Sequence, residues 1–177
     1  MSHPFAMPHD LPSADTIVFR GAGVVLATPY LLRLWTMLGL VLEHGNPDAE
    51  RAAHLMHFLA FGEQEPDGHT SALDRLLCGL PLARPSDAPV SPSATERQAI
   101  DGLLGAMITH WTALGQTSVE GLRNTFLQRE GSLVQGEGCW QLYVTPSAVD
   151  YLLDRLPWRF AKCKFPWMPQ PLSVLWR

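Results

Sequence analysis

One amphipathic run constrains the fold of this chain more than any other feature. Ser93-Ala94-Thr95-Glu96 has the pattern of a capping box, in which the serine and glutamate side chains bind the first free backbone amides of a helix. The apolar residues that follow recur at the i, i+3, i+4, i+7 spacing of a single helix face. They are Ile100, Leu103, Leu104, Met107, Ile108, Trp111 and Leu114. A long helix with one buried face is therefore predicted, and the rest of the chain must supply its core.

Local start and stop signals predict five further helices. Thr-Pro and Asn-Pro pairs, capping boxes and terminal glycines mark their ends. The predicted ranges are 29–44, 48–61, 71–78, 117–129 and 145–156. In the fourth of these, Glu120 is assigned to a capping box that begins at Thr117. Arg123, Arg129 and Glu130 are expected on a solvated face with local ion pairs.

Three regions are predicted to form strands. β-Branched residues around two glycines suggest a strand, or two short strands with a bend, over residues 17–26. A hairpin is expected within residues 132–144, around the turn Gly136-Glu137-Gly138. The segment from Arg159 to Trp176 has room for two short edge strands broken by prolines. The predicted class is α+β, mainly helical with about six helices and a small, mostly antiparallel sheet.

Composition predicts one globular domain. The chain has 177 residues, 46% of them hydrophobic and 17% charged, which is enough apolar surface for a buried core. Residues 1–15 are expected to form a flexible tail, and residues 16–177 the domain. Residues 81–92 carry four prolines and are expected to form its longest loop.

Charge and cysteine content exclude several classes of protein. The net charge is −4 without a block of like charges, so no nucleic-acid partner is expected. Cys78, Cys139 and Cys163 cannot all pair and lack zinc spacing, and the N-terminus lacks the pattern of a secretory signal. Both observations favour reduced thiols in a cytoplasmic product.

One stretch has the length of a membrane span. Residues 22–42 carry a single charge, but Pro29 lies near the start and Arg33 at the centre. A strand followed by a buried amphipathic helix accounts for the stretch better, and no membrane contact is expected.

The residues that could carry chemistry do not form a recognisable site. His54 and His57 are three positions apart on one predicted helix face, as metal ligands can be, but no third ligand recurs at a matching offset. Cys78 ends an apolar run before Gly79-Leu80-Pro81, which is typical of a buried structural thiol at a helix end. No catalytic residue, cofactor or metal is expected, and the chain is not predicted to be an enzyme.

Large aromatic residues are concentrated toward the C-terminus. The candidate partner-contact residues are Trp158, Phe165, Trp167 and Trp176. One interpretation is that they cap the core of their own domain. The other is that some of them dock onto a partner, because tryptophans are frequent anchors of protein interfaces.

Four segments carry a resemblance to a known family. They are IVFRGAGVVLATPYLLRLWTMLGL from Ile17, LLCGLPL from Leu76, HWTALGQTSVEGLRNTFLQREGSL from His110, and LPW with FPWM near the end. In this order they resemble the C-terminal conserved region of tape-measure proteins of phage-tail-like contractile injection systems. The motif positions that the resemblance marks as structural are Cys78, Gly79, Leu80, Pro81, Glu120, Arg123, Phe126, Arg129, Gly131 and Pro157.

The resemblance implies a structural and assembly role. Members of the family are usually longer on the N-terminal side, so this chain is expected to be the folded terminal domain of a tape measure, or a short paralogue, that anchors at the baseplate or inner tube and takes part in tube assembly or length control. The implied partners are baseplate hub, spike or inner tube proteins, with a homo-oligomer possible. The alternatives are an adaptor without a role in length control and a small metal-dependent effector that uses His54 and His57.

Overall fold

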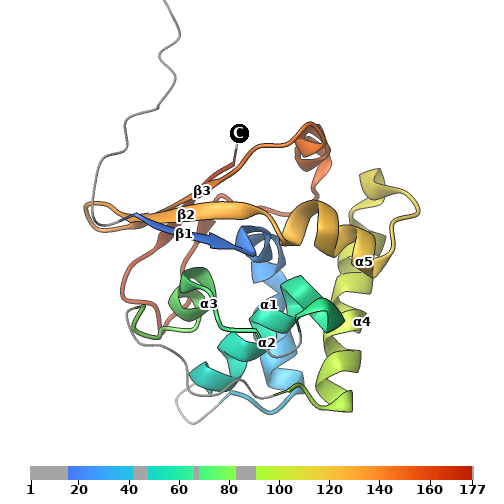
Figure 1. Ribbon diagram of the computed structural model, residues 1–177, viewed down its shortest axis with the longest axis horizontal. Helices are drawn as coiled ribbons and strands as arrows, with labels where there is room; N and C mark the ends of the chain where they lie inside the picture. The colour runs from blue at the N-terminus through green and yellow to red at the C-terminus, as the bar shows by residue number, and fades with distance from the viewer. Residues whose placement is uncertain (1–15, 42–47, 66–67, 83–90, 177) are drawn as a thin grey trace, which may run out of the picture.

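In the described part of the chain, five strands form one sheet, and helices α1 to α5 lie on one side of it (Figure 1). The computed structural model describes residues 16–41, 48–65, 68–82 and 91–176. In sheet order the strands are β1 (Ile17–Arg20), β2 (Glu130–Gln135), β3 (Trp140–Val144), β5 (Leu172–Leu175) and β4 (Lys162–Cys163). All neighbours are antiparallel except β3 and β5. The α+β class and the mostly antiparallel sheet are confirmed.

Within the described ranges, five α-helices make up most of the second layer. They are α1 (Thr28–Met37), α2 (Ala49–Phe61), α3 (Ala72–Leu77), α4 (Ala94–His110) and α5 (Val119–Leu122). Short helical segments connect them: η1 (Ala22–Ala27), η3 (Gly62–Gln64), η4 (Thr112–Leu114), η5 (Arg123–Leu127) and η6 (Asp150–Arg155). The capping box of α4 is confirmed, since Ser93 Oγ accepts from the Glu96 amide at 3.2 Å and the Glu96 carboxylate accepts from the Ser93 amide at 2.8 Å.

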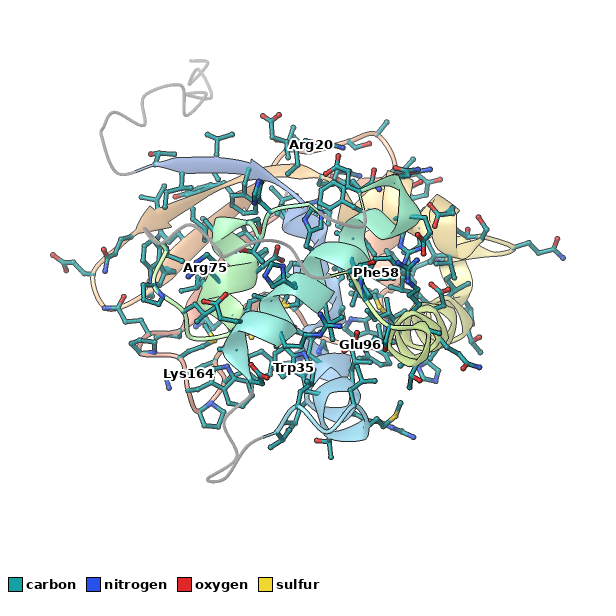
Figure 2. The ribbon with its side chains drawn as sticks, turned by 60° about the horizontal axis from the view of Figure 1, so that its bottom comes forward. Arg20, Trp35, Phe58, Arg75, Glu96 and Lys164 are labelled. Carbon is teal, nitrogen blue, oxygen red and sulfur yellow. The ribbon has the colours of Figure 1, made fainter. Side chains whose placement is uncertain are left out.

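Aromatic side chains fill the core between sheet and helices. Trp35 of α1 and Trp111 after α4 are fully buried, and for Trp111 the apolar spacing predicts this. Trp111 packs on Phe126 with ring centroids 4.8 Å apart. Figure 2 shows Trp35 and Phe58 within the helical layer. None of the helices in the described ranges is long and apolar enough to cross a bilayer.

The segment predicted as a strand over residues 17–26 is only partly one. β1 ends at Arg20, because Gly21 adopts a left-handed conformation with φ 94° and its amide, like that of Ala22, donates to the Arg129 carbonyl at 2.9 Å. Residues 22–27 then form the fully buried η1. A Cβ on Gly23 would lie 1.8 Å from the Phe126 carbonyl oxygen, so this glycine lets η1 approach the backbone of η5.

Helix α1 ends earlier than the sequence predicts. Gly39, with φ 69°, follows the C-cap Leu38. The Leu40 amide donates to the Trp35 carbonyl at 2.8 Å and the Gly39 amide to the Thr36 carbonyl at 3.1 Å, which is a Schellman motif. Gly39 therefore ends the helix, and Gly45, the predicted terminator, lies outside the described residues.

The predicted helices over 117–129 and 145–156 are shorter and less regular than expected. The N-cap of α5 is Ser118 rather than Thr117, and its Oγ accepts from the Gly121 amide at 2.9 Å. After four residues the helix widens into the π-helical η5. The predicted helix over 145–156 is reduced to the 3₁₀ segment η6, because Asp150 instead accepts from the Ser147 amide and closes a turn there.

The last strand is an interior strand, which corrects the prediction of two edge strands. β5 lies between β3 and β4, parallel to the former and antiparallel to the latter, so that of the two C-terminal strands β4 alone is at an edge. β1 is the opposite edge. The predicted tail over 1–15 and residues 83–90 of the predicted loop over 81–92 lie outside the described residues.

Candidate interaction surface

The two histidines on α2 have different surroundings. His57 is buried. Its Nε2 lies 3.0 Å from the Glu65 carbonyl oxygen, and its ring stacks on Phe61 with centroids 4.6 Å apart. Burial lowers the pKa of both His57 and His54. In the described part of the chain, no three His, Cys, Asp or Glu side chains come together in a group that could hold a metal ion.

The Cys-Gly-Leu-Pro motif forms the end of α3. Cys78 is the buried C-cap, its thiol lies 3.7 Å from the Met56 sulfur, and burial raises its pKa well above the ordinary value. Gly79 has φ 75°, and the Leu80 amide donates to the Arg75 carbonyl at 2.8 Å, which makes a second Schellman motif. The Arg75 Nε then donates to the Pro81 carbonyl at 2.7 Å. The whole motif is accounted for by helix termination and packing.

Arg123 lies inside the protein and not on the solvated face predicted for it. The side chain is 3% exposed, and its Nε donates to the Leu59 carbonyl of α2 at 3.0 Å. Its guanidinium pairs with Glu120 at 2.5 Å and Asp101 at 3.3 Å. This one side chain joins α2, α4 and α5. Glu120, predicted as a capping-box residue, instead forms an ion pair with this guanidinium, because the N-cap is Ser118 and its partner amide is that of Gly121.

Arg129 is the second internal cross-link. Its guanidinium pairs with Asp150 at 2.7 Å and donates to the carbonyls of Thr125 at 2.8 Å and Thr145 at 3.0 Å. Asp150 also accepts from the indole nitrogen of Trp176 at 3.1 Å. Burial opposes ionisation of Asp150, but these donors together hold its pKa below the ordinary value.

The four candidate aromatic residues do not form one patch. Trp158 donates to the Leu26 carbonyl at 2.9 Å and packs edge-on against Tyr30. Phe165 and Trp167 stack with ring planes 9° apart, and Trp167 donates to the Leu77 carbonyl at 2.8 Å.

Trp176 packs in a third place, against Phe160, and is 7% exposed. Every indole of the candidate set thus has a hydrogen-bond acceptor inside its own chain, which supports the interpretation that these residues cap the core.

Two other motif residues are fixed by close packing. Phe126 is 1% exposed beneath Trp111. A Cβ on Gly131 would lie 2.6 Å from Ala22 Cβ, so this position in β2 admits only glycine without a shift. Pro157 is exposed beside the candidate Trp158.

A row of side chains crosses the outer face of the sheet. Val18, Ser132, Tyr143 and Leu175 are paired in register across β1, β2, β3 and β5. The adjacent row, with Leu133, Leu142 and Val174, is buried beneath the sheet, so this row points away from the helices. Val18 is 65% and Leu175 42% exposed.

The row borders a shallow hollow of about 310 Å³. Glu130 is the single charged side chain among the described residues that line it. Interface centres are typically depleted of charge and enriched in aromatic residues such as Tyr143. We call these four residues, Val18, Ser132, Tyr143 and Leu175, the sheet row. The sequence analysis did not predict this surface. Its one local signal is in β5, where Leu175 is apolar but lies on the strand face opposite to the buried Leu172 and Val174.

Comparison with known proteins gives one result. The family model for the contractile injection system tape measure protein matches residues 6–176. No curated protein and no solved structure is significantly similar to the chain. The match spans every described strand and helix, the motif residues and the sheet row. The chain therefore belongs to the contractile injection system tape measure protein family.

Proposed function

We propose that this chain is a non-enzymatic assembly component that anchors at one end of the inner tube of a contractile injection particle. The family match over residues 6–176 is the observation that carries this proposal, because tape measure proteins are structural components of the injection system. The partner is a baseplate hub, spike or inner tube protein, and the chain meets it in the cytoplasm during assembly. Its contribution is tube assembly or length control.

The sheet row is the surface best suited to that anchor. Val18 and Leu175 expose apolar surface that no described element covers, and Ser132 and Tyr143 add polar groups between them. Burying such surface stabilises a complex by about 25 cal/mol per Å² before the costs of association. The candidate residues Phe165 and Trp167 do not belong to this surface, because both rings pack against Trp35 of α1 on the helical side of the sheet and Trp167 donates to the Leu77 carbonyl.

The experiment is co-assembly of the tagged chain with the other particle proteins. We expect the parent chain to copurify with assembled particles. Val18→Ser and Leu175→Ser should each lower the copurified amount at least about fivefold, since interface centres contribute most of the binding free energy. Tyr151→Ser is the matched control, because Tyr151 is 63% exposed but lies on η6 outside the row.

Two outcomes would contradict the proposal. Absence of the parent chain from particles removes the assembly role altogether. Equal copurification of the Val18, Leu175 and Tyr151 variants removes the sheet row as the anchor. Tube length in particles made without the chain can be measured by electron microscopy. A changed length supports a role in length control, and an unchanged length supports an adaptor.

A further inference from the structure

A groove of about 500 Å³ lies between α1 and α4, apart from the sheet row. Leu34 and Met37 line it from α1, and Leu103 lines it from α4. Its lining along α4 extends from Thr95 to His110, which at about 1.5 Å per residue corresponds to about 22 Å. That length matches about four turns of a helix. The groove is thus long, mainly apolar and walled by two helices.

Small residues give the groove a flat floor. Ala99, Gly102 and Ala106 line it at positions i, i+3 and i+7 of α4. A Cβ added to Gly102 would meet nothing within 4 Å, so packing within the described chain does not require glycine there. Glycine in a helix interior is destabilising by about 1 kcal/mol relative to alanine. A floor of this kind lets the backbone of another helix approach closely.

The groove carries positive charge. Arg33 is exposed, and it is the one fully charged side chain among the described residues that line the groove. The nearby acids of α4 are engaged elsewhere, Glu96 with Arg51 and Asp101 with Arg123. One end is closed by Tyr30, whose hydroxyl lies 2.7 Å from His110 Nδ1. Among the described residues, the groove thus places one exposed cation beside an apolar floor, in a chain whose net charge is −4.

A second copy of this chain fits this charge pattern poorly. Two-fold pairing through the groove would bring the two Arg33 side chains to the same interface, because symmetric contacts use the same patch twice. The described lining offers no carboxylate to separate them. A partner with its own acidic residue satisfies both the charge and the apolar floor.

We propose that the α1/α4 groove binds an amphipathic helix of a different protein of the injection particle. That helix has an apolar face for Leu34, Leu103 and the small residues, and a Glu or Asp opposite Arg33. Helix-in-groove recognition works in this way, with apolar anchors at i, i+3, i+4 and i+7. The inference rests on the proposed function only for where the partner is found.

Gly102→Leu in the co-assembly experiment tests the proposal. The substitution fills the groove, and the chain should fold at least as well as the parent because the new side chain starts in open space and favours the helix. We expect at least about a tenfold loss of copurification with particles. Gly105→Ala is the control on the same helix, since Gly105 lies outside the groove lining and its added Cβ is also unobstructed.

Charge variants test the acidic partner. Arg33→Glu should lower copurification at least about tenfold, and Arg33→Lys should retain most of it. Arg159→Glu, an exposed charge reversal outside the groove, is expected to leave it unchanged. Circular dichroism of each variant establishes that it is folded.

A photo-crosslinking residue at Met37, which is 62% exposed at the groove wall, identifies the occupant by mass spectrometry. The expected product is a helical segment of another particle protein that carries Glu or Asp. A cross-link to a second copy, or to a segment without an acidic residue, would overturn the proposal, as would normal copurification of Gly102→Leu and Arg33→Glu. If the parent itself is absent from particles, the proposed function fails and this inference with it. If the parent copurifies with particles and the groove variants copurify equally well, this inference fails and the proposed function stands.

Discussion

The indole nitrogen of Trp176 donates a hydrogen bond to the carboxylate of Asp150 at 3.1 Å. This bond attaches the residue after β5 to η6, and Arg129 on the other side of the carboxylate attaches both to the start of β2. Asp150 is 3% exposed, so its charge is stabilised by these donors and not by water.

Asp150→Asn tests how much this network stabilises the fold. The neutral amide keeps the size of the side chain but removes the charge that Arg129 faces, and hydrogen bonds to charged groups contribute about 1.5–3 kcal/mol. We expect the free energy of unfolding to fall by about 2 kcal/mol in urea denaturation. Glu137→Gln in the exposed hairpin turn is the control and should change it by less than about 0.5 kcal/mol. Equal stability of the two variants would contradict this assignment.

The pH dependence of stability follows from carboxyl groups that shift in opposite directions. Burial raises the pKa of Asp74 from 3.8 to about 7, although hydrogen bonds from the Ser71 amide and hydroxyl favour its ionised form. In Asp150 and Glu96, burial also opposes ionisation, but paired arginines and other donors lower the pKa overall.

The folded state therefore binds more protons at Asp74 than the unfolded state does between about pH 4 and pH 7, and this part of the stability falls as the pH rises through that window. Asp74→Asn should flatten the decline, measured as the difference from the parent in urea midpoint at pH 5 and pH 7.5. The histidines, whose lowered pKa values act in the opposite direction, contribute equally to both proteins and cancel. Below about pH 4 both proteins should lose stability as Asp150 and Glu96 become protonated. A difference between the proteins that does not change with pH would disprove the role of Asp74.

Gly23→Ala probes the contact between η1 and η5. The added methyl group would lie 1.8 Å from the Phe126 carbonyl oxygen, so backbone must move, and we expect a loss of about 3 kcal/mol or more. Gly105→Ala provides the comparison, because its Cβ meets nothing within 4 Å and the helix gains up to about 1 kcal/mol. Thermal unfolding of both variants measures the contrast, and a Gly23→Ala protein as stable as the parent would show that η1 is not packed this closely.

Arg123→Lys separates the guanidinium from its charge. Lysine keeps the charge but cannot bind Leu59, Glu120 and Asp101 at once, so a buried carbonyl loses its donor at an expected loss of about 2 kcal/mol. Arg20→Lys changes an exposed pair with Glu65 and should change stability by less than about 1 kcal/mol. If chemical denaturation gives the same small value for both substitutions, Arg123 does not hold α2, α4 and α5 together.

Local signals in the sequence were sufficient for features that a few neighbouring residues determine. The Ser93 capping box and the apolar face of α4 are examples, because each depends on residues within one or two turns. The π-helical η5, the buried position of Arg123 and the cross-link made by the partly buried Arg129 could not be predicted in this way. Their hydrogen-bond acceptors include the carbonyls of Leu59 and Thr145, which are 64 and 16 positions away in the sequence. From its neighbours alone, a charged side chain in such a segment is predicted to face solvent.

The interaction surfaces show the same limit. Assigning Val18 and Leu175 to one row needs the register of strands from both ends of the chain, and the groove needs the placement of α1 against α4. The aromatic residues at 158, 165, 167 and 176 were predicted as partner contacts from their residue type. Residue type does not reveal that carbonyls of the same chain accept hydrogen bonds from the indoles of Trp158 and Trp167. Only the fold shows whether an indole N–H already has a hydrogen-bond acceptor in its own chain.

Because β5 is an interior strand, the sheet cannot be completed until the last residues of β5 have been synthesised. β1, β2 and β3 can pair as soon as the ribosome has released residue 144, but β3 then presents an open edge until residues 172–175 emerge. Exposed strand edges are sites of aberrant pairing. Each nascent chain thus passes through an interval in which a neighbouring polypeptide can occupy the place of β5. On crowded polysomes, rapid completion of translation or a chaperone that covers β3 would protect the yield of correctly folded protein.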